Sequence, residues 1–318
     1  MKGYQPPFTM TEEVANLLAE VAELCGRISA LDTLSTNPIL RRENRIRSIH
    51  SSLAIEQNSL TLDQVTDVIE GKRVLGPAQD IREVQNAYQV YEMLLDFNPF
   101  QVEDLLKAHQ ILMLDLIKEA GMFRSKGVGV YSSKGLIHAG TPPQYVPELV
   151  RDLFAWLGST GLHPLIASSI FHYEFEFIHP FADGNGRIGR FWHTLILSNW
   201  KEFFRWLPIE TVIKDRQEEY YLALNTSNRQ GESTQFVCFM LEVIKETIKE
   251  LSYITNNRGD LSEELLRLLS EDPSHTAKTM AEKLKVSDRQ IQRILKDLKE
   301  KEKIERVGNN RKGFWIVK

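Results

Sequence analysis

The sequence predicts a mainly α-helical protein that contains one short β-hairpin and ends in a small module of helices and a second hairpin. Apolar residues recur at helical spacing over most of residues 11–255, whereas β-prone runs are confined to 127–141 and 304–317. The 318 residues are 42% hydrophobic and 26% charged, with a formal net charge of -4, which is typical of a globular chain of two or three domains. We expect the domains to be residues 1–98, 99–256 and 257–318.

Helices are expected throughout the N-terminal part. Thr11, followed by two glutamates, is a helix start signal, and a second helix with a basic first half is expected over 38–56. A short helix follows over 61–71. Two amphipathic helices are predicted over 80–97 and 99–118, separated by an Asn-Pro break.

The middle of the chain changes from helix to hairpin and back. Residues 127–132 and 136–141 are short β-prone runs around Ser-Lys-Gly, which predicts a hairpin. A helix is expected over 143–157. Apolar residues at helical spacing then predict two buried helices, over 168–178 and from about 183 to 200, with a polar loop held between them.

Two further helices are expected before the C-terminal module, over 214–228 and 234–255. The run Asn256-Asn-Arg-Gly259 carries the residues of a linker. We expect the long helix over 234–255 to end there and the C-terminal module to begin.

The stretch His179-Pro-Phe-Ala-Asp-Gly-Asn-Gly-Arg-Ile-Gly-Arg190 is the strongest candidate for a functional site. Pro180 ends the first buried helix, and Gly184 and Gly186 allow the backbone to approach a ligand at the start of the second. Backbone N–H groups at a helix N-terminus attract anions. Arg187 and Arg190 lie three residues apart on one helix face, so the site suits a polyphosphate better than a single carboxylate.

Two side chains in this stretch can bind a metal or accept a proton. Asp183 is a hard oxygen ligand beside the predicted phosphates, where Mg²⁺ is commonly bound. A neutral His179 can accept a proton from an incoming hydroxyl. Taken singly, Asp183 can serve only as an N-cap, His179 as a loop histidine and the glycines as a turn; their combination in one loop favours function. Phe181 is expected to anchor the loop in the core.

This stretch resembles the motif of the Fic family, His-x-Phe-x-Asp/Glu-Gly-Asn-Gly-Arg-x-x-Arg, at every specified position. The resemblance implies a Fic-type helical core and an enzyme that transfers AMP from ATP to a Tyr, Thr or Ser hydroxyl of a target protein, with Mg²⁺. It implies that His179 is the general base and that the nucleotide is bound along the segment from Asp183 to Arg190. The members of that segment are Asp183 as the metal ligand, the cradle Gly184, Asn185 and Gly186, the phosphate-binding Arg187 and Arg190, and Ile188 and Gly189 between them.

The resemblance extends to three other places. One class of the family carries Ser/Thr-x-x-x-Glu-Gly/Asn on a helix before the core, and its glutamate pairs with the last motif arginine and blocks productive ATP binding. Ser52 and Glu56 match this pattern, but Gln57 departs from it. The predicted hairpin corresponds to a flap that aligns the target segment by backbone pairing. Tyr220 and Asn228 match positions near adenine and ribose, although core packing and a helix C-cap are close alternatives.

The C-terminal module resembles a winged helix-turn-helix. Helices are expected over 261–269, 276–285 and 287–301, followed by strands over 304–307 and 313–317. Ile291, Ile294, Leu295 and Leu298 should face inward, and Arg289, Arg293 and Lys296 outward, with Arg311 at the tip of the wing. Residues 258–318 hold 15 Lys and Arg against 11 Asp and Glu, so DNA binding through residues 276–312 is expected, with protein contacts as the alternative.

Composition argues against a disulfide-rich protein, a zinc protein and a membrane-spanning protein. Cys25 and Cys238 are too few for a disulfide framework or a zinc site, and no stretch is apolar enough to cross a membrane, so a reducing cytoplasmic location is expected. The partners implied are a target protein and DNA, and a homodimer is left open. Three functions stay open as well: adenylyl transfer, a DNA-binding regulator whose Fic core senses nucleotide, and reverse or variant phosphate-group transfer with Glu56 orienting water.

Overall fold

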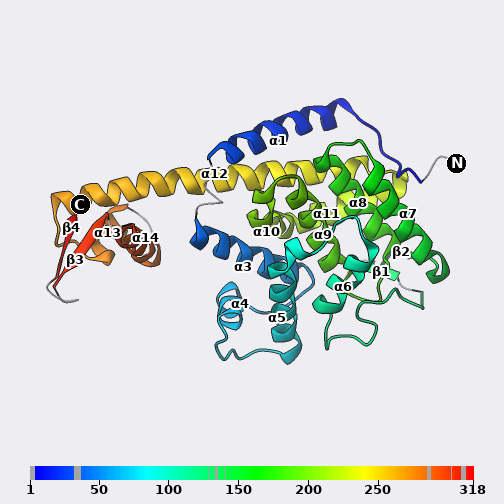
Figure 1. The fold of residues 1–318 in the computed structure, drawn as a ribbon, viewed down its shortest axis with the longest axis horizontal. Coiled ribbons are helices and arrows are strands. Elements are labelled where there is room, and N and C mark those ends of the chain that lie inside the picture. Colours follow the sequence, from blue (N-terminus) through cyan, green and yellow to red (C-terminus); the bar gives the residue numbers. More distant parts are fainter. Residues whose placement is uncertain are drawn as a thin grey trace. The chain divides into compact units, whose positions relative to one another are not determined.

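The structure is a computed structural model that describes residues 4–31, 37–127, 129–132, 135–139, 141–284, 288–301, 303–308 and 313–318 (Figure 1). Within these ranges it describes the backbone alone at 30–31, 129–132, 135–139, 253–261, 288–290, 293, 297 and 300. The chain divides into two compact units, Met1–Lys249 and Glu250–Lys318. Both units are built mainly of helices, and each of them contains a two-stranded sheet, so the predicted mainly α fold is confirmed.

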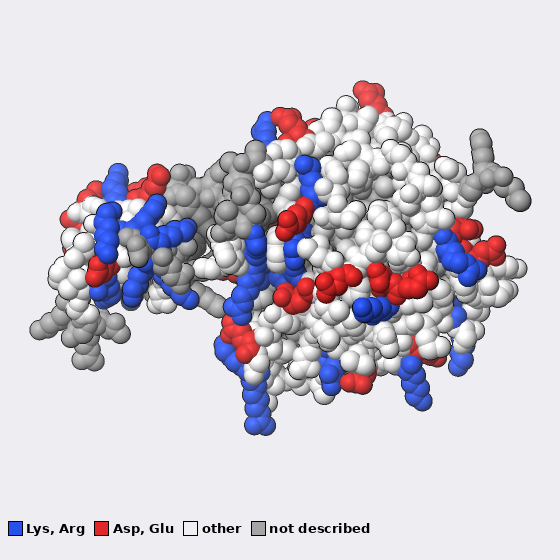
Figure 2. Space-filling view, in the orientation of Figure 1, with Lys and Arg blue, Asp and Glu red and all other residues white. Residues whose placement is uncertain are grey.

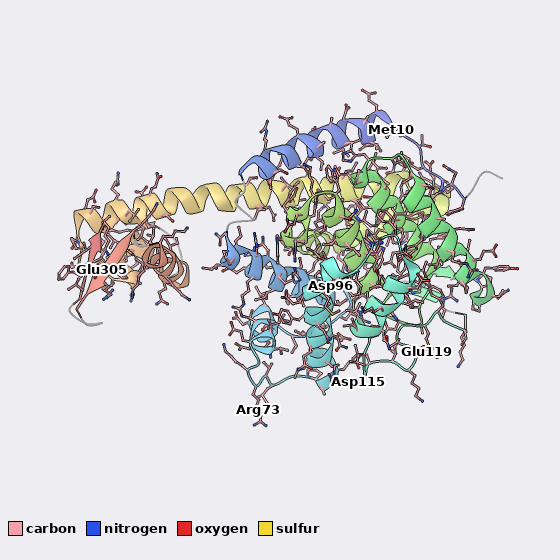
Figure 3. All side chains as sticks on the ribbon, in the orientation of Figure 1. Met10, Arg73, Asp96, Asp115, Glu119 and Glu305 are labelled. Carbon is pink, nitrogen blue, oxygen red and sulfur yellow. The ribbon has the colours of Figure 1, made fainter. Side chains whose placement is uncertain are left out.

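The N-terminal helices form close to where they were predicted. They are α1 (Glu12–Leu31), α3 (Pro38–Ile55), α4 (Leu62–Ile69), α5 (Ala78–Glu92), the 3₁₀ turn η1 (Leu94–Asp96) and α6 (Val102–Leu112). Side chains begin two of them: Asn37 caps α3, and Thr61 forms a capping box with Gln64 at the start of α4. The prediction that the helix from residue 99 reaches 118 is wrong, because α6 ends at Leu112 and Asp115 takes a left-handed backbone conformation with φ 62°. Asp115 and Glu119, which follow α6, lie at the periphery of the unit (Figure 3).

The middle of the chain contains the predicted hairpin and the two buried helices. Strands β1 (Gly129–Ser132) and β2 (Gly135–Ala139) pair antiparallel, with a register shift between Val130 and Tyr131. After them come η2 (Pro143–Tyr145), α7 (Val146–Ser159), α8 (Pro164–Ile178) and α9 (Asn185–Trp200). The side chain of His138 on β2 lies outside the described part of the chain.

Helices α8 and α9 pack closely against each other and carry the candidate site between them. Gly189 makes this approach possible, because a Cβ added there would lie 2.9 Å from Glu176 Oε1 on α8. Phe171, Phe175, Phe191 and Trp192 are fully buried and fill the surrounding core. The loop that joins the two helices is therefore supported on both sides by packed aromatic residues.

The last helices of the larger unit are η3 (Glu202–Trp206), α10 (Ile209–Asp215), α11 (Gln217–Gln230) and the first part of α12 (Thr234–Glu271). The predicted end of this helix at a 256–259 linker, with a separate helix starting at 261, is wrong: α12 runs without a break to Glu271. Gly259 is the only poor helix former in that linker, and an interior glycine costs about 1 kcal/mol, whereas a proline would have ended the helix.

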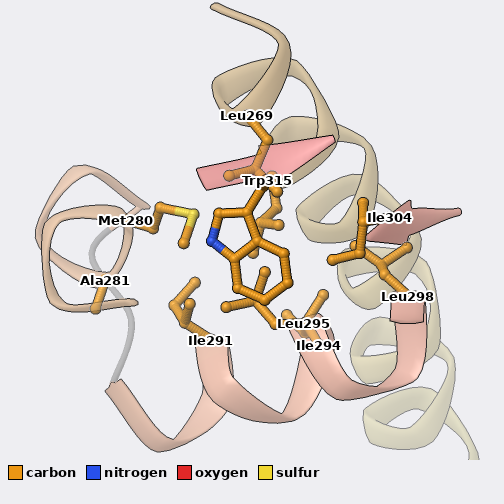
Figure 4. Close-up of a cluster of buried hydrophobic side chains, with 10 residues drawn as sticks. Leu269, Met280, Ala281, Ile291, Ile294, Leu295, Leu298, Ile304 and Trp315 are labelled. Carbon is orange, nitrogen blue, oxygen red and sulfur yellow. The ribbon is translucent and has the colours of Figure 1, made fainter. Parts of the chain in front are cut away.

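The smaller unit has its own hydrophobic core. The end of α12, helices α13 (Ala277–Leu284) and α14 (Asp288–Glu300), and the antiparallel strands β3 (Ile304–Val307) and β4 (Phe314–Val317) surround it (Figure 4). The predicted inward residues Ile291, Ile294, Leu295 and Leu298 all belong to this core, together with Met280, Ile304 and Trp315. The side chains of Arg289 and Arg293, and all of Ser287 and Arg311, lie outside the described residues.

Surface charge differs between the two units. Lys and Arg side chains gather on the smaller unit with acidic ones among them, as the counts of residues 258–318 indicate (Figure 2). No helix among the described residues is long and apolar enough to cross a bilayer. Cys25 and Cys238 are both buried free thiols.

Candidate active site

The site is centred on the loop that leaves α8 at His179 and enters α9 at Asn185. His179 caps α8 in the left-handed conformation, with φ 52° and ψ 62°, while its N–H donates to the Phe175 carbonyl over 2.9 Å. A left-handed histidine is uncommon, and it turns the chain sharply away from the helix axis. The His179 side chain is 19% exposed, so the imidazole is partly open to solvent at the mouth of the loop.

Arg124 holds the turn at His179 in place, and sequence reasoning did not identify it. Its buried guanidinium donates to four carbonyl oxygens, those of His179 at 2.6 Å, Ile178 at 3.2 Å, Thr141 at 2.5 Å and Lys126 at 3.0 Å. Its backbone N–H also donates to the Pro180 carbonyl over 3.0 Å. Because Thr141 follows β2 closely, one side chain ties the histidine turn to the base of the hairpin.

His109 on α6 contacts the middle of the loop at Phe181 and Asp183. Its ring stacks on Phe181 with centroids 3.6 Å apart, and Phe181 is fully buried, as expected of an anchor. The Gly121 N–H donates to His109 Nδ1 over 2.9 Å, so the ring proton lies on Nε2, which donates to the Asp183 carbonyl over 2.9 Å. Burial lowers the pKa of His109 to about 4, which keeps this hydrogen-bonded neutral form in place at neutral pH.

Gly184 and Asn185 shape the start of α9. Gly184 is the N-cap, with φ 82°, and a Cβ there would lie 2.6 Å from Met113 Sδ, so both its conformation and its packing require glycine. Asn185 was expected to cradle phosphate, but its side chain is buried and exchanges two 2.9 Å hydrogen bonds with the backbone of Phe181. Its amide therefore closes the loop, and only the backbone N–H of Asn185 is left to serve a ligand.

Asp183 lies at the open side of the loop. One carboxylate oxygen accepts from the Gly184 N–H at 2.5 Å and from Arg187 Nη2 at 2.9 Å, while 55% of the side chain remains exposed. The alternative in which Asp183 is only the N-cap of the second helix is wrong, because Gly184 holds that position.

The two motif arginines are buried and each is paired with a carboxylate from the N-terminal helices. Arg187 Nη1 lies 3.1 Å from Glu83 Oε1 on α5. Arg190 donates to the Ser52 hydroxyl at 3.1 Å, to the Ser52 carbonyl at 2.9 Å and to Glu56 Oε1 at 2.8 Å. Burial alone would lower the pKa of Arg190, but Glu56, together with Tyr220 and Glu176, outweighs this and raises it.

Glu56 lies over the N-terminal turn of α9. A Cβ added at Gly186 would collide with its carboxylate, so the carboxylate occupies the space next to the backbone of the predicted phosphate cradle. It is an anion at the positive end of a helix, where such groups are stabilised. Ser52 and Glu56 therefore both contact Arg190, and the resemblance had implied the contact of Glu56.

The departure at Gln57 has a structural consequence. Gln57 takes the left-handed conformation, with φ 69°, at the residue where the family pattern has Gly or Asn. These are the residue types that tolerate this conformation, whereas a glutamine there is strained by about 1–2 kcal/mol. Helix α3 thus ends in the turn that the pattern predicts, with a less suitable residue in it.

Glu176 is a second group that sequence reasoning missed. Its carboxylate lies 3.9 Å from His179 Nδ1 and 3.8 Å from His172 Nε2, between α8 and the arginine of α9. The pKa of Glu176 is raised to about 8, because burial, with a smaller contribution from Glu56, raises it more than Arg190 lowers it. No spacing rule identifies it, because a glutamate on an apolar helix has no signature beyond its own charge.

The remaining predicted binding residues lie in different surroundings. Ile188 is fully buried in the core, and Gly189 faces α8, so neither has a side chain that reaches the open side of the loop. Tyr220 is buried, with its hydroxyl 3.2 Å from His172 Nε2. Asn228 lies inside α11, which is capped by Gly231, so it is not the C-cap. Among the described residues, its buried Oδ1 has no hydrogen-bond partner and remains available to a ligand donor.

Comparison with known proteins agrees with this geometry. The profile of the Fic/DOC family matches residues 99–197, and that of an HTH domain matches residues 261–314. The protein adenylyltransferase fic-1 of Caenorhabditis briggsae is 27% identical over 290 residues, which are 86% of this chain and 52% of that protein. The chain spans about half the length of the curated relatives that it matches.

Solved structures extend the comparison to the whole chain. Fic-1 of C. elegans shares the fold with a TM-score of 0.65 and 23% identity, over 77% of this chain and 73% of that one. A crystal structure of a Fic family protein from Desulfovibrio desulfuricans G20 superimposes with a TM-score of 0.78. It is 44% identical and covers 99% of this chain and 98% of its own. A match of that identity over nearly the whole length, with the family motif in the loop between α8 and α9, means that this chain belongs to the Fic family.

Proposed function

We propose that this protein transfers AMP from ATP to a Tyr, Thr or Ser hydroxyl of a target protein, and that Glu56 restrains the reaction. The observation that carries the proposal is the juxtaposition of His179, at the open end of a glycine-rich helix start, with the buried cations Arg187 and Arg190. This arrangement supplies a base at one end and a polyphosphate site at the other. The curated relative named above, fic-1 of Caenorhabditis briggsae, is a protein adenylyltransferase.

The acceptor end depends on His179. In the proposed reaction the hydroxyl oxygen attacks the α-phosphorus, its proton passes to the imidazole, and the bond between that phosphorus and the bridging oxygen to the β-phosphate breaks. Pyrophosphate leaves with the electron pair of that bond. The imidazole must be neutral to accept the proton, so transfer should fall at acid pH.

The leaving group depends on the start of α9. The backbone N–H groups of its first turn, with Arg187 and Arg190, are placed to hold the β- and γ-phosphates while negative charge develops on them. A preorganised cationic site of this kind supplies most of the catalysis in phosphoryl and nucleotidyl transfer. Asn228, with a buried acceptor inside α11, is a candidate contact for the nucleoside.

A magnesium ion fits this site through Asp183. Mg²⁺ in nucleotide sites is commonly held by one or two carboxylates together with substrate phosphates and waters, so an exposed carboxylate beside the phosphate site suffices. When bound, the ion would neutralise phosphate charge. Asp183 would offer it Oδ2, since the contacts to Gly184 and Arg187 use Oδ1.

The proposed restraint comes from the position of Glu56. Its carboxylate pairs with Arg190 and lies against Gly186, so it competes with the terminal phosphate for the arginine and for the helix start. Nucleotide bound beside it would lack the anchor that aligns the α-phosphorus. The acceptor protein is expected to add backbone pairing along β1 and β2.

The test is incubation with ATP labelled on the α-phosphate, comparing wild type with Glu56→Gly and with Glu56→Gly/His179→Ala. We expect strong protein labelling only with Glu56→Gly, and a loss of about 10²–10⁴-fold on removal of the base. His179→Ala should leave ATP affinity nearly unchanged in a calorimetric titration, because the imidazole serves the hydroxyl and not the phosphates. Labelling by the double variant at the level of Glu56→Gly would refute the assignment of the base.

We also propose that residues 276–312 bind duplex DNA, because an HTH profile matches this unit and Lys296 on α14 is exposed. Binding to phosphates through Lys and Arg weakens steeply with salt. A gel-shift series across salt concentrations should show this, and Arg293→Ala should weaken binding more than Arg267→Ala on α12. Absence of binding to any duplex at low salt would favour a unit that contacts protein.

A further inference from the structure

The arginine closer to the loop, Arg187, has a buried partner that neither the motif nor the inhibitory pattern includes. Glu83 Oε1 on α5 lies 3.1 Å from Arg187 Nη1, and the exposed fractions of the two side chains are 10% and 6%. Asp183 is the other carboxylate that contacts Arg187, but it is mostly exposed. A buried guanidinium without a counter-charge is costly, so it requires a partner that stays in place.

Glu83 itself is fixed by the residue that follows the strained turn at the end of α3. Asn58 Nδ2 donates to Glu83 Oε2 over 2.9 Å and to the Asp80 carbonyl over 3.1 Å. Ser59 adds two hydrogen bonds to the Asp80 carboxylate, so residues 58–59 are bound to the first two turns of α5. The end of α3 therefore contacts the nucleotide site by two routes: Glu56 to Arg190, and Asn58 through Glu83 to Arg187.

The two routes place the carboxylates differently. The Glu56 carboxylate lies against Gly186, in the space proposed for phosphate. Glu83 contacts Nη1 of Arg187, while Nη2 of the same group reaches Asp183 on the open side of the loop. Among the described residues, buried Arg187 Nε has no hydrogen-bond partner, so it remains as a donor for an incoming anion. Glu83 thus holds one edge of the guanidinium and leaves the others for the site.

We propose that Glu83 is a positioning residue for Arg187 and that the Asn58–Glu83 hydrogen bond couples this arginine to the end of α3. The role of Glu83 in catalysis rests on the proposed function. Its effect on nucleotide binding can be measured without that function. When Asp183 binds a metal, Glu83 is the carboxylate that keeps Arg187 oriented. Without the charge of Glu83, Arg187 has only Asp183 as its counter-charge and stays paired with it. The nucleotide must then break this pair before its phosphates can bind Arg187.

The effect should appear as weaker ATP binding without a rise in turnover. Arg187 contacts the phosphates already in the ground state, so loss of its orientation raises Kd. Because Arg187 also stabilises the charge that develops on the leaving group, kcat should not rise. Glu56 acts on the productive fraction of bound nucleotide, so its removal should raise kcat. This difference separates a positioning role for Glu83 from a second inhibitory carboxylate.

The experiment is a calorimetric titration of the full-length protein with a non-hydrolysable ATP analogue and Mg²⁺, in the Glu56→Gly background. Glu83→Gln keeps the shape and the acceptor for Asn58 but removes the charge, and it should raise Kd about tenfold, as loss of about 1.4 kcal/mol does. Glu83→Asp should retain part of the affinity. Glu92→Gln is the matched control, because Glu92 pairs with buried Arg45 at the other end of the same helix and should leave Kd unchanged.

Asn58→Ala tests the coupling to α3. We expect a smaller rise in Kd, about threefold, and a combined effect with Glu83→Gln that is clearly less than additive, since both changes act on one network. An unchanged or lower Kd for Glu83→Gln, or an equal rise for Glu92→Gln, would overturn the positioning role; additive effects would overturn the coupling. Because binding is the readout, a failure of labelling by Glu56→Gly would count against the proposed function and not against this inference.

Discussion

Replacing Glu56 by glycine should convert a restrained enzyme into an active one. The carboxylate lies 2.8 Å from Arg190 Nη2, and the exposed fractions of the two side chains are 32% and 1%. The pair is therefore largely withdrawn from water on the arginine side and open on the glutamate side. Removing the carboxylate frees Arg190 for the terminal phosphate and removes a like charge from the space beside Gly186.

The magnitude follows from what Arg190 loses. A hydrogen bond to a charged group contributes about 1.5–3 kcal/mol, and the exposure of Glu56 argues against a larger value. That free energy corresponds to an increase of roughly 10- to 150-fold in the productive population and hence in transfer at saturating ATP. Arg190 keeps its two hydrogen bonds to Ser52, so its guanidinium should stay in place after the change.

The assay is the initial rate of labelling from α-labelled ATP at saturating nucleotide, for wild type, Glu56→Gly and Glu56→Gly/Arg190→Ala. The double variant should be inactive, because the released arginine is the anchor. Glu70→Gly is a suitable control. Glu70 caps the end of α4 and pairs with Arg42 away from the site, so this substitution should not change the rate. Equal rates for wild type and Glu56→Gly would falsify restraint by this carboxylate, and the Gln57 turn would then be the first place to look.

Three further changes test the structure around the site. Glu176→Gln should remove a pH dependence: the pKa of Glu176 is raised to about 8, so its protonation contributes stability that is fully present below about pH 4.5 and is lost as pH rises through 8. Wild type should therefore lose a few kcal/mol relative to Glu176→Gln between these values, measured by denaturant unfolding across pH, and a constant difference would contradict the burial argument. Gln57→Gly should raise the free energy of unfolding by up to about 1 kcal/mol by relieving a φ of 69°, seen as a higher Tm; a lower Tm would mean that the side chain contributes more than the strain. Arg124→Ala should cost about 3–5 kcal/mol, because it leaves four carbonyl groups without their donor, whereas Arg151→Ala on α7 should be nearly neutral in the same thermal scan.

Much of this protein could be predicted from local sequence. Helical spacing around the motif predicted α8 and α9, and the loop between them followed from Pro180 and the glycines, because these signals act over a few residues. The inward faces of α14 could be read from the period of Ile291, Ile294, Leu295 and Leu298 in the same way. Local signals failed where two outcomes differ by little free energy. Helix α12 continues through Gly259, where an end was predicted, and α6 ends before residues 113–116, where a continuation was predicted.

The supports of the site were decided by the tertiary structure. His109 reaches Asp183 across 74 residues of sequence, Arg124 reaches His179 across 55, and Arg190 reaches Glu56 across 134. Of these, only the contact of Glu56 was implied in advance, and a family pattern implied it. A histidine or arginine acquires such a role when packing buries it and leaves a carbonyl or a carboxylate within reach, because a buried polar group must then find its partner there. The sequence by itself determined the loop and the residues proposed for the chemistry, and the tertiary structure decided which others hold them in position.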